Sequence, residues 1–180
     1  MKDIILRIKD NDGIEFTTEG KFWAKGNTTL IQYDETELSG MEGCTTSLTI
    51  TPTRVRMKRV GDRLSDNTEM IFEKGRRMHG LYATPYGNVA MEILTNSISG
   101  LNMPSAERDK LSIDYSISLK GLFDADKKLD IEILSKDGTD LADMMEAALA
   151  PQPEEKEETF SDFLDKLTRR IMNEGKNDVQ

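Results

Sequence analysis

An acid and a guanidinium stand at matching positions on two segments in which apolar and polar residues alternate. Glu35 is in phase with Ile31 and Tyr33, and Arg59 is in phase with Met57. Alternate side chains of a strand point to the same face, so both charged groups should lie on an apolar face. A buried charge without a partner is very costly, and we therefore expect Glu35 and Arg59 to pair.

Hydroxyl groups should gather at the same place, because alternate strands of a meander end at the same rim. Thr46 begins the segment between the two charged residues, and a later segment ends just before a Pro-Tyr-Gly turn. The predicted set is Tyr33, Glu35, Thr46, Arg59, Tyr82, Thr84 and Tyr86. Two interpretations remain open. The network could plug and order one end of the fold, or it could bind the polar head of a ligand whose tail enters an apolar interior.

The elements that position these residues are predicted from alternation of period two. It is clear in residues 47–50, 54–58, 88–93, 111–119 and 129–133. Turn signals rich in Gly, Pro, Asn and Asp separate the segments at intervals of about ten residues, too short for parallel crossovers. Closing such a meander removes its exposed edges. We therefore predict an all-β fold, an antiparallel up-and-down β-barrel of about 8–10 strands spanning residues 1–135.

The pattern changes to helical spacing after Ser135. We predict a helical C-terminal extension over residues 136–180, with a helix at about 140–150, an acidic linker at 151–158 and a helix at about 160–174. The second helix has an apolar stripe formed by Phe160, Phe163, Leu164, Leu167 and Ile171. This stripe could pack on the barrel, or it could dock a protein partner or a second copy of the chain.

Residue types that usually perform catalysis are scarce. The only histidine is His79, which is out of phase with Tyr82 and should face outward, and the only cysteine, Cys44, should be buried and inert. No set of residues has metal-ligand spacing. We therefore expect no catalytic residues, no metal, no cofactor and no enzymatic activity.

Four methionines could line the interior, either as ordinary core or as an adaptable pocket. They are Met57, Met70, Met78 and Met91.

Charge and hydropathy limit the classes of partner that the protein could bind. The net charge of −9 disfavours nucleic acid and anionic membranes as partners. Arg54, Arg56 and Lys58 form a basic stripe, but they lack the interleaved aromatic residues that base stacking needs. The N-terminal apolar run is broken by Arg7 and Lys9, which is not typical of a signal peptide or a membrane span. We expect a soluble, cytoplasmic protein.

Three segments resemble one family. Tyr33-Asp34-Glu35, the threonine-rich segment from Thr45 to Gly61 with its Arg59-Val60-Gly61, and Thr84-Pro85-Tyr86-Gly87 are similar to the YwiB-like family of uncharacterised bacterial proteins. The resemblance covers residues 1–135, and the strand from Leu111 to Gly121 also fits. It implies a calycin-like barrel, the architecture of lipocalins, and it brings no established activity.

Two functions follow as expectations. The first is non-enzymatic binding of a small, largely apolar ligand at the Glu35/Arg59 mouth of the barrel. The alternative is a protein-interaction or scaffold module that uses the barrel exterior and the C-terminal helix. The volume of the interior cavity separates them, because a ligand needs space that a scaffold can fill with side chains.

Overall fold

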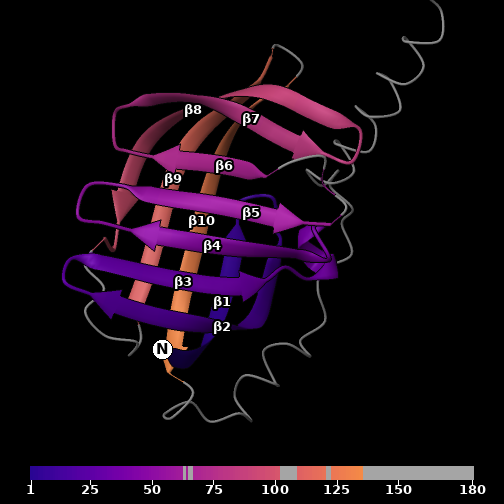
Figure 1. The fold of residues 1–180 in the computed structure, drawn as a ribbon. Coiled ribbons are helices and arrows are strands. Elements are labelled where there is room, and N and C mark those ends of the chain that lie inside the picture. The colour runs from indigo at the N-terminus through magenta and orange to yellow at the C-terminus, as the bar shows by residue number, and fades with distance from the viewer. Residues whose placement is uncertain (63, 65–66, 102–108, 121–122, 136–180) are drawn as a thin grey trace, which may run out of the picture. The chain divides into compact units, whose positions relative to one another are not determined.

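Ten antiparallel strands form a single sheet that curls into a barrel. The computed structural model describes residues 1–62, 64, 67–101, 109–120 and 123–135. The strands are β1 (Lys2–Asp10), β2 (Glu15–Lys25), β3 (Thr28–Asp34), β4 (Cys44–Ile50), β5 (Val55–Gly61), β6 (Thr68–Phe72), β7 (Arg77–Thr84), β8 (Gly87–Ser99), β9 (Asp109–Leu119) and β10 (Phe123–Ser135). Their order in the sheet is β6-β5-β4-β3-β2-β1-β10-β9-β8-β7. In Figure 1, β2 to β6 cross the front of the view, and β8, β9 and β10 pass behind them at a steep angle.

Alternation of burial is typical of strands with one inward face, and β4 shows it most clearly. On β4, Cys44, Thr46, Leu48 and Ile50 are buried, while the residues between them are partly exposed. The predicted all-β, antiparallel, up-and-down architecture is confirmed.

Among the described residues the one helical element is the short 3-10 helix η1 (Glu37–Ser39), and no helix there is long and apolar enough to cross a membrane. The predicted helices at 140–150 and 160–174 lie outside the described residues.

The inward faces meet in an apolar core between the two walls of the barrel. Leu6, Ile31, Leu48, Leu111 and Ile131 are all 0 % exposed. Full burial of one such side chain stabilises the fold by about 1.5–3 kcal/mol. The core also joins the two walls directly, because the Phe72 ring of β6 meets the Tyr115 ring of β9 edge to face, with centroids 4.9 Å apart.

The barrel is nearly closed, with a seam between β6 and β7. These strands follow each other in the chain and lie close together, yet they stand at opposite ends of the strand order and share no ladder. At one end of the seam a side chain replaces the ladder, since the Ala83 N–H donates to Thr68 Oγ1 at 2.9 Å. At the other end the β6–β7 turn bonds to β8 instead. The Gly75 N–H donates to the Thr95 carbonyl at 2.8 Å, and the Thr95 N–H donates to the Arg76 carbonyl at 3.3 Å. The full closure expected from the sequence is therefore interrupted along one line.

Candidate functional site

The first candidate site is the inward-facing ion pair at one barrel end. Arg59 Nη2 lies 2.9 Å from Glu35 Oε1, and the two side chains are 13 % and 2 % exposed. The Thr46 hydroxyl donates to the same carboxylate oxygen at 2.6 Å, and Arg59 Nε donates to Thr46 Oγ1 at 3.2 Å. Adjacent strands supply these groups, because Thr46 pairs with Tyr33 on β3 and with Arg59 on β5. The structure thus brings Glu35, Thr46 and Arg59 together.

Two buried tyrosines complete this network. The Tyr33 side chain hydrogen-bonds with Thr46 and Glu35, and the Tyr82 side chain hydrogen-bonds with Arg59. Burial raises the pKa of both phenols, and the negative charge of Glu35 adds to the effect. Burial is the largest single influence on the Arg59 guanidinium and would lower its pKa, but Glu35, Tyr82 and Tyr33 together outweigh it and the net pKa is raised. Arg59 therefore stays charged inside the barrel.

The structure places Thr84 and Tyr86 in the turn beside the network. The Thr84 hydroxyl donates to the Gly87 carbonyl at 2.7 Å and accepts from the Tyr86 N–H at 3.2 Å. Tyr86 itself is 62 % exposed. These bonds satisfy the β7–β8 turn, so the Thr84 hydroxyl is used locally and the Tyr86 ring lies in solvent.

A second charged group at the same end was not predicted. Asp10 closes β1 in phase with Ile8, and its carboxylate accepts the N–H groups of Asp12 and Ile14 at 2.9 and 3.0 Å. Lys127, in phase with Leu129 on β10, is 10 % exposed and forms an ion pair with Asp12. Burial raises the pKa of Asp10, and burial lowers the pKa of Lys127 against the opposing charge of Asp10. The signal was available, since both residues continue an apolar face by the rule that identified Glu35 and Arg59.

These groups satisfy one another. Each charged side chain of this end has an opposite charge or hydrogen-bond donors beside it, as buried charges require. Among the described residues no group of His, Cys, Asp and Glu could hold a metal ion, and the thiol-bearing Cys44 is buried. The geometry therefore favours the interpretation in which this network orders the barrel end.

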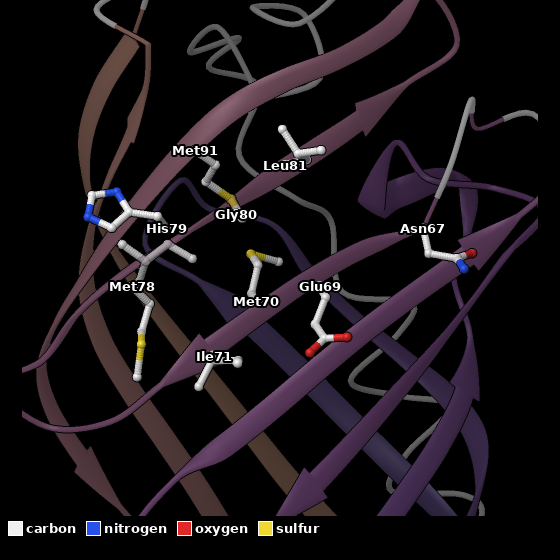
Figure 2. Close-up of a pocket in the computed structure, with 10 residues that line it drawn as sticks. Asn67, Glu69, Met70, Ile71, Met78, His79, Gly80, Leu81 and Met91 are labelled. Carbon is white, nitrogen blue, oxygen red and sulfur yellow. The ribbon is translucent and has the colours of Figure 1, made fainter.

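The second candidate site is a cavity of about 270 Å³ at the seam between β6 and β7. Its inner wall is apolar, formed by Met70, Met78, Met91 and Ile93, and its rim includes Asn67, Glu69 and His79. In Figure 2, the thioethers of Met70 and Met91 point toward one another near Gly80, while the His79 imidazole points away. The cavity thus joins the barrel surface to buried side chains of the core.

Gly80 lies beside this cavity. It is in phase with Met78 and Tyr82, so a side chain there would point into the barrel. A Cβ at Gly80 would lie 3.3 Å from Met91 Cε and 3.4 Å from the Glu69 carbonyl oxygen. Because glycine has no side chain, the Met91 methyl group and the backbone of β6 can approach β7 closely at this point, and Gly80 forms part of the cavity lining.

Charges at the rim are paired away from the opening. Arg56 donates to both carboxylate oxygens of Glu69 at 2.8 and 2.7 Å, on the outer face of the barrel. His79 Nδ1 lies 3.5 Å from Glu92 Oε2, and the imidazole is 72 % exposed, facing outward as predicted. At the rim, the charge of Glu69 is therefore balanced by Arg56, and the interior of the cavity is lined by methionine side chains.

Comparison with known proteins identifies the family. Residues 1–131 match the family model described as a domain of unknown function, DUF1934. The chain belongs to this family. The solved crystal structure of the ywiB protein from Bacillus subtilis is similar, with a TM-score of 0.61 and 23 % sequence identity. The match covers 77 % of this chain and 93 % of that chain. The suspected family is confirmed, and the structural match shows a shared fold. No curated protein sequence matches the chain.

Proposed function

We propose that this DUF1934 barrel is a non-enzymatic protein that binds a small, largely apolar molecule in the seam cavity. The observation that supports this is the open cavity of about 270 Å³ beside Gly80, which has an apolar inner wall and a polar rim. Its volume is just below the range of about 300–1,000 Å³ that is common for pockets holding drug-sized ligands. The proposal includes a calycin-like barrel as the fold. It also includes a reducing, cytoplasmic location, because a single buried cysteine, Cys44, is typical of proteins in such compartments.

Three methionines suit the cavity to such a ligand. Met70 and Met91 are 5 % and 4 % exposed, and both border the opening together with Met78. Methionine side chains are flexible and polarisable, so they can close over an empty cavity and move aside for a guest. The polar network at Glu35 and Arg59 then keeps the barrel end rigid while the seam admits the ligand.

Native mass spectrometry of the protein isolated from its own cells tests this proposal. We expect the purified protein to retain a bound small molecule, and we expect Gly80→Leu to lose it because the new side chain fills the cavity. Ala24→Leu, at an exposed position of β2 remote from the seam in the strand order, is the matched control and should retain the ligand. An absence of any bound small molecule from the parent protein, or an equal ligand-bound fraction in Gly80→Leu, would overturn the proposal.

An interaction module is the second candidate. A groove of about 400 Å³ on the outer face involves Arg77, Glu92, Ser116, Asp124 and Asp126. Its mixed charges suit a polar protein surface better than a small apolar ligand. A protein that co-purifies with the parent chain, but not with a variant carrying Arg77→Ala and Asp124→Ala, would favour this function.

A further inference from the structure

Three methionine side chains form part of the wall of the seam cavity. Met70, Met78 and Met91 line it, and the thioethers of Met70 and Met91 point toward one another near Gly80 (Figure 2). Oxidants convert the apolar side chain of methionine to a polar one, because its sulfur forms a sulfoxide. The structure therefore brings two groups with this chemistry together at one open cavity.

A small neutral oxidant can enter this cavity. The cavity reaches the surface, since Leu81, which is 52 % exposed, and His79, whose side chain is 72 % exposed, also line it. Its volume of about 270 Å³ is several times the share of one molecule in liquid water, which is about 30 Å³. Hydrogen peroxide is uncharged and little larger than water, so the cavity has room for it.

Met57 has nearly the same burial as these residues but does not border the cavity. Met57, Met70 and Met91 are 3 %, 5 % and 4 % exposed. Met57 pairs with Met70 across β5 and β6, one strand further from the seam, and it is not among the residues that line the cavity. If burial alone decided reactivity, the three sulfur atoms would resist an oxidant equally. If the cavity admits the oxidant, Met70 and Met91 should react while Met57 is protected.

A sulfoxide would be poorly tolerated in this wall. The position of a Cβ at Gly80 lies 3.3 Å from Met91 Cε and 3.4 Å from the Glu69 carbonyl oxygen, so the end of the Met91 side chain and this carbonyl lie on the same spot of β7. A sulfoxide oxygen accepts hydrogen bonds and donates none, and burying it without a donor is costly. Because no ladder joins β6 to β7, the seam can open locally and expose the new oxygen to water.

We infer that Met70 and Met91 are oxidation sites, and that their oxidation by hydrogen peroxide opens the seam. The sulfur donates a lone pair to one peroxide oxygen, an S–O bond forms and the O–O bond breaks. The other oxygen takes the proton of the transferred hydroxyl group and leaves as water. The sulfur is oxidised by two electrons and the peroxide is reduced by two. Both sites are independent of any ligand in the cavity.

Peptide mapping by mass spectrometry after brief treatment of the folded protein with hydrogen peroxide tests the two sites. The oxidation rate of each methionine is divided by its rate in the chain unfolded in urea, which removes differences in intrinsic reactivity. We expect this ratio to be at least about tenfold higher for Met70 and for Met91 than for Met57. A ratio for either residue as low as that of Met57 would overturn the inference.

Filling the cavity should protect both sulfur atoms. We expect Gly80→Leu to lower the ratios of Met70 and Met91 by at least about fivefold, and the control Ala24→Leu to leave them unchanged. Unchanged ratios in a folded Gly80→Leu variant would mean that the oxidant does not arrive through the cavity, which contradicts the inference. If Gly80→Leu does not fold, the comparison with Met57 in the parent protein still decides.

Hydrogen exchange measures whether oxidation opens the seam. In the oxidised parent, exchange should accelerate by at least about fivefold along β7 and stay unchanged on β3 and β4. The double variant Met70→Leu/Met91→Leu, treated with peroxide in the same way, cannot be oxidised at these positions and should exchange like its untreated form. Equal exchange on β7 before and after oxidation of Met70 and Met91, or equal acceleration in the double variant, would refute the link between the two sites and the seam.

Discussion

Glu35 and Arg59 show how a charge is tolerated inside an apolar barrel. The carboxylate accepts from both the guanidinium and the Thr46 hydroxyl, with both charged side chains largely removed from water. The attraction within such a pair is set against the cost of dehydrating both ions, so the pair as a whole contributes little net stability. Losing one partner is different, because the other charge is then left buried and unpaired.

Variants at these two positions should therefore be strongly non-additive. We expect Glu35→Ala to lower the free energy of unfolding by about 3–5 kcal/mol, since Arg59 is left without its partner. The double variant Glu35→Leu/Arg59→Met should cost clearly less than the sum of Glu35→Leu and Arg59→Met. Urea unfolding of the three variants measures this, and additive losses would mean that the two charges are not coupled.

Strands β6 and β7 are the elements on which the functional proposal depends. The two edges approach closely, yet no ladder joins them. Thr68 accepts from Ala83 at one end of the seam, and the β6–β7 turn bonds to Thr95 of β8 at the other end. Backbone hydrogen bonds of a ladder protect a sheet against local opening, so a seam without one should open more readily than the rest of the barrel.

Thr68 should control that opening. Thr68→Val removes the acceptor of the Ala83 N–H while keeping the side-chain shape, and Thr68 is 0 % exposed. The orphaned donor should lower the free energy of unfolding by about 1–3 kcal/mol. Hydrogen exchange should accelerate at the Ala83 amide and along β7, and much less on β3 and β4. Uniform acceleration over all strands would mean that the seam is no weaker than the other strand pairs.

At the scale of the whole molecule, buried phenols predict a loss of stability in alkali. Burial raises the pKa of Tyr33 and Tyr82, and it raises the pKa of Tyr115 to about 12. Above pH 10 the unfolded chain loses these protons while the folded chain keeps them, so the free energy of unfolding falls as the pH rises. Each phenol contributes at most about 1.4 kcal/mol per pH unit, and the contribution of Tyr115 ends near its folded pKa.

Tyr115→Phe isolates one of these contributions while keeping a ring against Phe72. Between pH 10.5 and 11.5 the free energy of unfolding should fall less steeply in the variant than in the parent, by about 1 kcal/mol per pH unit. Urea unfolding across this range measures the slopes. Equal slopes would contradict the burial of the Tyr115 hydroxyl.

The alternation of apolar and polar residues predicted most strands of this barrel. It could not predict how distant strands meet to close the barrel. Alternation alone placed Glu35 and Arg59 on an inward face, because period two is a property of every strand. The same rule applies to Asp10, the last residue of β1, and to Lys127, which lies within β10 but before Leu129, where clear alternation in the sequence begins. Thr84 shows the opposite case, since a turn used a hydroxyl that strand position alone assigns to the network. The seam was not predictable, because it depends on bonds from Thr68 to Ala83 and from Gly75 to Thr95 that no sequence period encodes.

Diffraction from crystals under xenon pressure tests the central claim most directly, because xenon enters dry apolar cavities of proteins. The account predicts a xenon site between Met70 and Met91 beside Gly80, and its loss in Gly80→Leu with the rest of the barrel unchanged. Absence of xenon from the seam of the parent protein, or its persistence in Gly80→Leu, would contradict an opening at this position.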